Sequence, residues 1–223
     1  IGIHPEEHEE EEEEEEHGHG FEVHPEEAFI ETISVPGVTF KAGKFLSQFG
    51  KYNSVHLHAQ PFISRGQVQE HMFGHEGFAS TGLSASALVP TPWFSELTIE
   101  ALQASTAELF EESHHATVYV AKLKNLWELS EALTFELGLS QLSYKRLAYN
   151  DHEEEMTRLF GSDFTFKWRP VKGGKASSFM WSTEYIEKER IGTTESENAG
   201  ITTFIRYQFA PRYFAQGQYE YLG

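Results

Sequence analysis

The stretch "LTFELGLS", Leu133 to Ser140, alternates apolar and polar residues without interruption. Side chains of a β-strand point to opposite faces in turn, so one face of this segment carries leucine and phenylalanine and the other carries polar residues and glycine. The same division recurs in "WFSELTIEA" (93–101), "TVYVAKLKNLW" (117–127) and "DFTFKWR" (163–169). The sequence therefore predicts an all-β protein whose strands have one apolar and one polar face.

Ten segments with this alternation follow one another along the chain. Many of them are about nine to thirteen residues long, which exceeds the usual globular strand and is close to the length of a tilted bilayer crossing. The sequence contains no apolar run long enough for a membrane helix. The predicted strands lie near residues 24–35, 38–50, 78–90, 92–103, 116–129, 132–144, 162–170, 176–188, 201–209 and 211–222.

The connections between these segments are alternately short and long. Short turns, with the proline, glycine or small polar residues that turns use, are expected at residues 35–38, 89–93, 129–133, 170–176 and 209–212. Long polar loops are expected at residues 51–77, 104–115, 145–161 and 189–200. If each strand pairs with the next, all short turns share one end of the sheet. This asymmetry is typical of an antiparallel up-and-down transmembrane β-barrel, with short periplasmic turns and long extracellular loops.

The two faces of the predicted strands suit lipid on one side and a water-filled pore on the other. Charged residues in the middle of strands predict a pore lining formed by Lys122, Lys124, Glu136, Lys167 and Arg206. Because such a lining contacts water, we expect these charges to tolerate substitution. The residues predicted to face lipid include Leu133, Phe135, Leu137, Leu139, Phe164 and Phe166.

Aromatic residues gather near the ends of the predicted strands, where the interfacial girdles of membrane barrels fall. They are Trp93, Phe94, Trp127, Trp168, Phe209, Tyr213 and Tyr221. A soluble β-barrel or sandwich remains the alternative, because alternation does not show whether the apolar face points inward or outward.

Three stretches of the sequence resemble a known family. They are "VTFKAGKFLSQFGKYNSVHLHAQPFISR" (38–65), "HEGFASTGLSASALVPTPWFSELTIEAL" (75–102) and "VYVAKLKNLWELSEALTFELGLS" (118–140). They are similar to Gram-negative outer-membrane proteins often labelled zinc-regulated TonB-dependent outer-membrane receptors, and the likeness extends more weakly to the C-terminus. The resemblance implies a porin-type β-barrel larger than ten strands. We therefore expect a partial chain with about ten strands of that barrel.

The beginning of the chain is compositionally distinct. Glu9 to Glu16 are eight consecutive glutamates within a chain whose formal net charge is −18. Such a run repels itself and is solvated, so we expect an acidic extracellular loop segment over residues 1–27, followed by the barrel portion over residues 28–223. The acidic balance argues against nucleic acid as a partner. The chain has no cysteine, which excludes disulfides and thiolate metal sites.

None of the twelve histidines lies in the middle of a predicted strand. They are His4, His8, His17, His19, His24, His56, His58, His71, His75, His114, His115 and His152. Imidazole beside carboxylate is typical ligation for zinc and other first-row divalent ions, so all twelve are candidate metal ligands at one mouth of the barrel. His56 and His58 share one side of an extended backbone, and His71 and His75 would converge in a helix. The alternative for each is a solvated loop residue.

The sequence contains no pattern typical of a catalytic site, since neither a GxSxG nucleophile elbow nor a GxxxxGK[ST] phosphate loop occurs. We expect a porin-like channel of the bacterial outer membrane for ions or small solutes, and no enzyme. Its loops would concentrate zinc or another divalent cation, and no other cofactor is assigned. Expected partners are outer-membrane lipid and the solutes, with a homo-oligomer left open. The alternatives are a metal-scavenging or surface-interacting barrel without an open pore, and a soluble β protein with a metal-binding tail.

Overall fold

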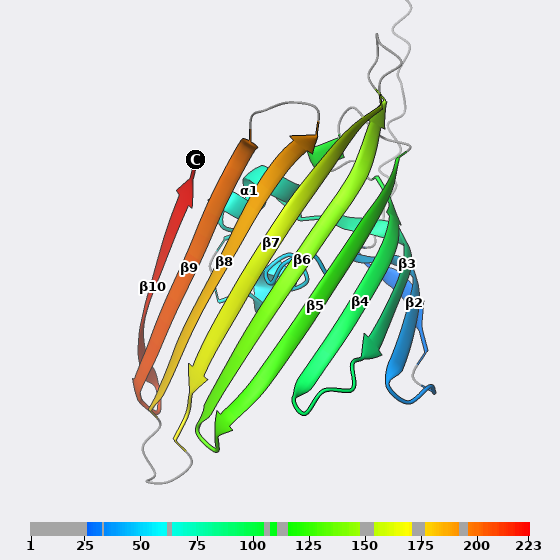
Figure 1. The fold of residues 1–223 in the computed structure, drawn as a ribbon. Helices are drawn as coiled ribbons and strands as arrows, with labels where there is room; N and C mark the ends of the chain where they lie inside the picture. The colour runs from blue at the N-terminus through cyan, green and yellow to red at the C-terminus, as the bar shows by residue number, and fades with distance from the viewer. Residues whose placement is uncertain are drawn as a thin grey trace, which may run out of the picture.

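The protein forms a single antiparallel sheet of ten strands. The structure, a computed structural model, describes residues 26–32, 34–61, 64–104, 108–110, 116–147, 154–170, 177–191 and 196–223. Each strand pairs with the next one along the chain, in the order β1 to β10 (Figure 1). The predicted all-β class and the up-and-down order are therefore confirmed. No helix in these described ranges is long and apolar enough to cross a membrane.

Every one of the ten predicted segments contains a strand. The strands are β1 (Ala28–Glu31), β2 (Val38–Leu46), β3 (Ala79–Leu88), β4 (Phe94–Gln103), β5 (Thr117–Ser130), β6 (Leu133–Leu147), β7 (Glu154–Trp168), β8 (Ser178–Ile191), β9 (Ser196–Ala210) and β10 (Tyr213–Leu222). The connections contain two 3₁₀ turns, η1 (Leu57–Ala59) and η2 (Glu108–Phe110), and one helix, α1 (Gln67–Phe73).

Two of the predicted long loops are largely strand. The charge of residues 145–161 and 189–200 predicts loops, but β6 to β9 extend well into both ranges. Strand pairing uses backbone hydrogen bonds, and charged side chains can support it across the ladder. Arg158 of β7, for example, lies directly opposite Glu189 of β8, an arrangement that favours pairing between opposite charges.

The connections are arranged as the sequence predicts in the described part of the chain. Because consecutive strands are antiparallel neighbours, the turns after β1, β3, β5, β7 and β9 share one end of the sheet, here called the short-turn end. It is the lower end in Figure 1. The connections after β2, β4, β6 and β8 belong to the opposite, long-connection end. The sheet is not closed, because β1 and β10 have no described strand on their outer edges.

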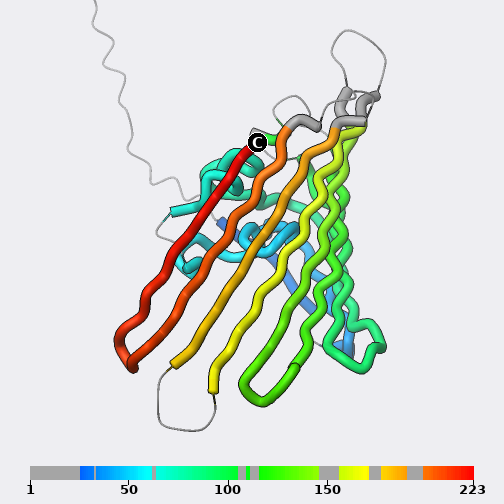
Figure 2. The backbone as a smooth tube through the Cα atoms, turned by 60° about the vertical axis from the view of Figure 1, so that its left-hand side comes forward, coloured from blue at the N-terminus to red at the C-terminus, as the bar shows by residue number. Residues whose placement is uncertain are grey.

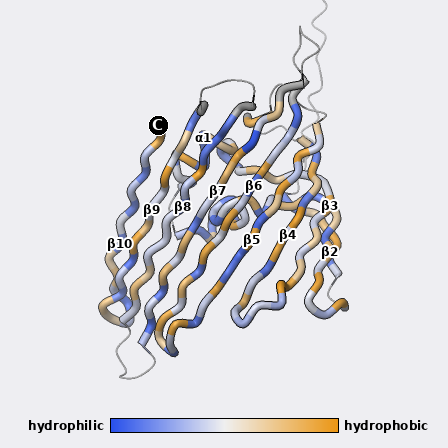
Figure 3. The backbone as a smooth tube through the Cα atoms, in the orientation of Figure 1, coloured by the Kyte–Doolittle hydropathy of each residue, from blue (hydrophilic) through white to orange (hydrophobic). Residues whose placement is uncertain are grey.

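The two faces of the sheet have different surroundings. The concave face, here called the inward face, carries residues 47–78 between β2 and β3, here called the internal segment (Figure 2). The convex, outward face has no covering layer in the described part of the chain (Figures 1 and 2). Hydrophilic and hydrophobic residues alternate along many of the strands, as Figure 3 shows. Alternate residues of a strand point to opposite faces, and the register places Glu100, Lys122, Glu136, Asp163 and Glu184 on the inward face.

Two glycines allow unusually close backbone approach near the first strands. Gly43 of β2, with φ of 134°, is the register partner of Gly82 of β3. A Cβ atom on Gly43 would meet the backbone of Phe29, and one on Gly82 would meet the backbone of Ala101 and Leu102. Only glycine fits both positions, and β1 to β4 turn away from the plane of the central strands (Figure 2).

Candidate functional site

The internal segment is the long connection that the sequence predicts over residues 51–77, but it packs against the inward face instead of forming a solvated loop. The segment contains η1 and α1, and its apolar residues are spaced to form one buried side. Within α1, Val68, Met72 and Phe73 lie on one helical face and are buried. Among the described residues of the segment, the other buried aromatic side chains are Phe49, Tyr52 and Phe78.

The apolar side of the internal segment packs on the half of the inward face nearer the long-connection end. Phe49 stacks edge-on with Phe73, with ring centroids 5.5 Å apart. The inward strand residues of this cluster are Phe45, Leu102, Val118, Val120, Leu142, Tyr144, Leu159 and Ile186. Burial of these side chains provides the main non-directional attraction between segment and sheet.

Nearer the middle of the inward face, polar contacts replace apolar ones. The Ser47 hydroxyl donates to Glu100 Oε2 at 2.8 Å, and the Gly50 amide donates to Ser140 Oγ at 3.0 Å. Lys122 Nζ donates to the Gly50 carbonyl oxygen at 2.5 Å. Glu100 and Lys122 are both buried, so these bonds satisfy groups that water does not reach.

Lys51 of the internal segment is held on both sides. Its ammonium group lies 2.7 Å from Glu136 Oε1, and its backbone amide donates to Glu184 Oε1 at 2.5 Å. Glu184 also accepts a hydrogen bond from the Gln69 side-chain amide. One carboxylate of β8 therefore fixes two parts of the internal segment that lie far apart in the sequence.

Tyr52 of the internal segment also contacts the inward face of the sheet. Its hydroxyl donates to Ser182 Oγ at 3.0 Å, and Ser182 Oγ also lies 3.1 Å from Thr165 Oγ1. Burial raises the pKa of the Tyr52 phenol well above its usual value, so the group remains a neutral donor.

The five predicted pore-lining residues lie on one face, but the internal segment covers two of them. Lys122 and Glu136 contact the segment instead of an open pore. Lys124 is partly exposed and lies 3.9 Å from Glu136 Oε2, whereas Lys167 is exposed. Arg206 lies over the rings of Phe204 and Phe214. The expectation that water contacts the whole lining is therefore wrong for Lys122 and Glu136. The apolar residues of the internal segment pack on the sheet and place Gly50 and Lys51 against these two side chains.

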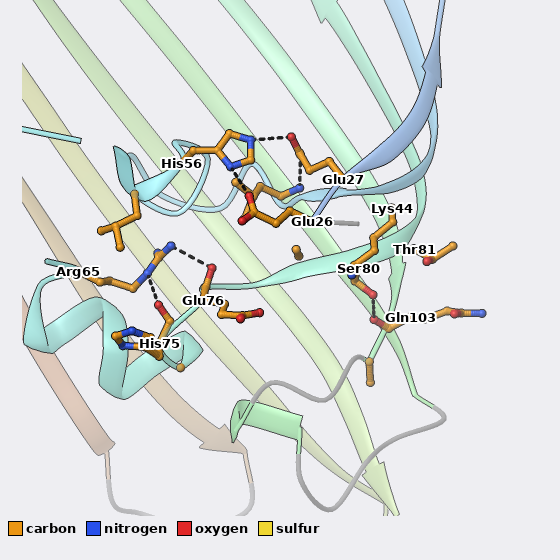
Figure 4. A pocket seen from close by; sticks show the side chains of 16 residues that line it. Glu26, Glu27, Lys44, His56, Arg65, His75, Glu76, Ser80, Thr81 and Gln103 are labelled. Carbon is orange, nitrogen blue, oxygen red and sulfur yellow. Dashed lines mark hydrogen bonds and ion pairs between the residues drawn. The ribbon is translucent and has the colours of Figure 1, made fainter. Parts of the chain in front are cut away.

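A cavity of about 550 Å³, here called the mouth pocket, lies between the internal segment and the ends of β2 to β4 (Figure 4). His56 stands on one side, with Nε2 2.8 Å from Glu27 Oε2 and Nδ1 3.5 Å from Glu26 Oε2. The other Glu27 oxygen accepts a hydrogen bond from the Leu46 amide at 2.7 Å. Glu27 thus joins the beginning of β1, the end of β2 and the internal segment.

Arg65 and the chain after α1 form the opposite side of the mouth pocket (Figure 4). Arg65 Nε donates to the His75 carbonyl oxygen and Nη2 to the Glu76 carbonyl oxygen, both at 3.0 Å. The guanidinium lies against Gly77, where any Cβ would collide with it. Burial lowers the pKa of Arg65, whereas the charge of Glu70 acts in the opposite direction. Arg65 therefore orders the loop that carries His75 and Glu76.

The structure brings some predicted histidines together. His56 and His58 stack with ring centroids 5.6 Å apart, and His56 and His75 line the same mouth pocket. α1 ends at Phe73, so His71 and His75 do not share one helix. Across the described ranges, no group of three or more histidines and carboxylates is positioned to hold a metal ion. His4, His8, His17, His19, His24, His114, His115 and His152 lie outside the described residues.

Sequence reasoning missed two buried carboxylates of the inward face, of which Glu184 accepts hydrogen bonds from the internal segment. Asp163 and Glu184 are cross-strand neighbours on the inward face, and both are buried. The alternation of residues could have identified them, because it places both carboxylates on the face opposite the apolar one. It does not indicate which distant segment covers that face.

Comparison with known proteins gives one distant relative and no family. No protein-family model matches the sequence, and no solved structure matches it. A protein of Aquifex aeolicus (strain VF5), described as an uncharacterized protein, is 28% identical to this chain. The similarity covers 64% of this chain and 34% of that protein, so the chain spans about a third of its relative's length.

Proposed function

We propose that this chain forms part of the wall of a porin-like channel in the Gram-negative outer membrane. The channel passes ions or small solutes, and its histidine- and glutamate-rich outer regions concentrate divalent cations such as zinc. The observation that carries the proposal is the outward face, which in the described part of the chain is uncovered, is free of charge over its central band and is bordered by aromatic rings. Such a face suits contact with lipid, and a water-facing sheet would expose polar residues there.

A continuous row of aromatic side chains crosses the outward face near the short-turn end. The ring centroids of Trp93 and Trp127 are 5.8 Å apart, and those of Trp127 and Phe135 are 5.7 Å apart. The row continues through Phe164 to Trp181, whose centroids are 4.9 Å apart. Rings at one level across several strands are typical of a membrane-interface girdle.

Charged side chains on the outward face support the same orientation. Among strand positions whose side chains the structure describes, outward charges are confined to the region near the long-connection end. They are Lys44, Lys145, Arg158, Glu187 and Glu189. Between this level and the aromatic row the outward positions carry no charge, as expected for a band in contact with hydrocarbon.

The free edge of β10 supports a larger barrel. β10 is ten residues long and exposed, and it contains neither the proline nor the lysine that protects many edge strands. It keeps the alternation of a wall strand, with Tyr219 and Tyr221 outward and Gln216, Gln218 and Glu220 inward. We infer that a further strand pairs with this edge.

The mouth pocket supports the divalent-cation part of the proposal. The ring nitrogens of His56 lie beside the carboxylate oxygens of Glu26 and Glu27 there. His75 and Glu76 lie on the other side of the pocket. These are ligand types that first-row divalent ions favour. Their separation suits weak, exchangeable binding that raises the local concentration of cations.

Two measurements test the proposal. Protein from outer-membrane fractions should migrate faster on a gel before boiling than after it, as folded barrels do. Purified protein in a planar lipid bilayer should then give discrete conductance steps. Heat-insensitive migration together with a water-soluble fraction would support a soluble β protein instead.

The extensive packing of the internal segment favours a second candidate, a barrel without an open pore that binds metal at its surface. Conductance separates the two candidates. A heat-modifiable outer-membrane protein that gives no conductance steps would establish the second candidate and remove the channel.

A further inference from the structure

All four histidines that the structure describes belong to the internal segment. Three of them, His58, His71 and His75, are exposed on it, together with Glu70 and Glu76. The sequence predicts these groups in a loop at the mouth of a barrel. In the structure they belong to the internal segment, which packs on the inward face of the sheet.

The internal segment is fixed across nearly the whole width of the sheet. Ser47 is bonded to β4, as described above, and the Gln67 amide at the start of α1 donates to Glu220 Oε2 of β10 at 2.7 Å. The Gln216 side-chain amide of β10 donates to the Pro61 carbonyl oxygen at 3.4 Å. Because contacts reach from β4 to β10, displacement of the segment would break bonds on several strands at once.

The cationic side chains of the internal segment, those of Lys51 and Arg65, are held in contacts within the protein. Lys51 is paired with Glu136 of the wall, and Arg65 is buried beneath the loop that contains His75. The exposed surface of the segment therefore presents the imidazoles of His58 and His71 and the carboxylate of Glu70, and beside the mouth pocket it presents His75 and Glu76. No three of the described groups converge on one point, so they favour successive weak contacts over a closed metal site.

We infer that the internal segment is the selectivity element of the channel, and that permeating first-row divalent cations bind transiently to His58, His71 and His75. This inference rests on the proposed channel function. Zinc ions would bind these imidazoles and slow the passage of other cations, whereas magnesium, which prefers oxygen ligands and keeps its water, would pass without this delay.

The first test measures how zinc chloride blocks the potassium current of the protein in a planar bilayer. The triple variant His58→Gln, His71→Gln and His75→Gln should raise the half-blocking zinc concentration at least fivefold. The matched control carries Ala59→Gln, Ser64→Gln and Gln67→Asn, at exposed positions of the same segment that have neither an imidazole nor a carboxylate, and should change it less than twofold. Magnesium chloride should block none of the proteins.

Each outcome separates the inference from the proposed function. Absence of conductance in the native protein overturns both. Conductance that zinc does not block, or a block that only the control variant relieves, overturns the inference and leaves the channel. Heat-modifiable migration equal to that of the native protein shows that each variant has folded.

A second test uses the absence of native cysteines. Ala59→Cys places one thiol on the exposed side of η1, and Glu189→Cys places one on the outward face near the long-connection end. A bulky thiol reagent should lower conductance at least twofold in Ala59→Cys and leave Glu189→Cys unchanged. If complete labelling of the Ala59→Cys variant leaves its conductance unchanged, the internal segment lies off the ion path and the inference is wrong.

Discussion

The inward and outward faces of the sheet show opposite relations between polarity and burial. On the outward face, Leu139, Ile99 and Ile205 are 48%, 55% and 42% exposed. On the inward face, Glu100 and Glu184 are each 1% exposed. A water-soluble β protein has the reverse arrangement, because it buries its apolar face and solvates its charges.

This difference shows that two kinds of force assemble the molecule. The strands pair through their backbones, and the outward face contributes little packing within the described chain. Internal cohesion comes from the internal segment, whose apolar side covers one half of the inward face and whose polar groups satisfy charges on the other half. Substitutions on the two faces should therefore respond to different environments, and the following experiments measure that difference.

The largest effect is expected for Lys122→Met. Lys122 is buried, donates to the Gly50 carbonyl oxygen and interacts with the charges of Asp163 and Glu184. Its loss removes the cation whose charge acts most strongly on the buried Asp163. Breaking a buried pair from one side typically costs about 3–5 kcal/mol, and we expect the free energy of unfolding to fall by that amount. Urea unfolding in lipid vesicles, followed by tryptophan fluorescence, measures it.

Lys167→Met is the matched control for this prediction. Lys167 belongs to the same face of the sheet but is exposed, so its replacement should change the free energy of unfolding by less than about 0.5 kcal/mol. Equal effects of the two substitutions would mean that the inward face is hydrated throughout. The comparison between buried and exposed inward charges would then fail.

The next largest effect is expected on the outward face. Leu139 lies near the middle of β6, with Leu123 and Ser162 as its register partners. If this face contacts lipid, Leu139→Arg near the midplane should lower the free energy of unfolding by about 2–4 kcal/mol. Leu133→Arg, at the short-turn end of the same strand, should cost about 0–1 kcal/mol. The same unfolding measurement in vesicles would contradict the lipid-facing assignment if both substitutions proved neutral.

The strand pattern was predictable because it is local. Alternation over "LTFELGLS" assigns Leu137 and Glu136 to opposite faces, and the register confirms that separation. The short turns were equally predictable, since proline, glycine or small polar residues mark them. Strand ends were less so, because the charges of Arg158 and Glu189 resemble those of a loop when the pairing partner is unknown.

The internal segment could not be predicted because its contacts join distant parts of the sequence. Lys51 and Glu136 are 85 positions apart, and the Lys51 amide and Glu184 are 133 positions apart. No periodicity in residues 51–77 identifies those partners. The mouth pocket was predicted in part: His56 and His75 were candidate ligands by residue type, but the role of Glu27 depends on a bond to the end of β2 that sequence does not show.

The smallest effect is expected for the His56 and Glu27 pair, which sharpens the contrast with Lys122. The His56 ring is about a third exposed and lies between two carboxylates, so its attraction to Glu27 is weakened by water and by the cost of ordering the side chains. A double-mutant cycle of His56→Gln and Glu27→Gln should give a coupling energy of about 0.2–1 kcal/mol. Glutamine at position 27 keeps an oxygen that can accept a hydrogen bond from the Leu46 amide, so the cycle isolates the ionic part of the contact.

Raising the salt concentration to about 1 M should reduce the coupling between His56 and Glu27, because exposed charges are screened within a few ångströms. It should change the cost of Lys122→Met much less, since that group is buried. A coupling above about 2 kcal/mol that salt does not reduce would place the mouth pocket in the same buried environment as the wall contacts and remove the distinction between them.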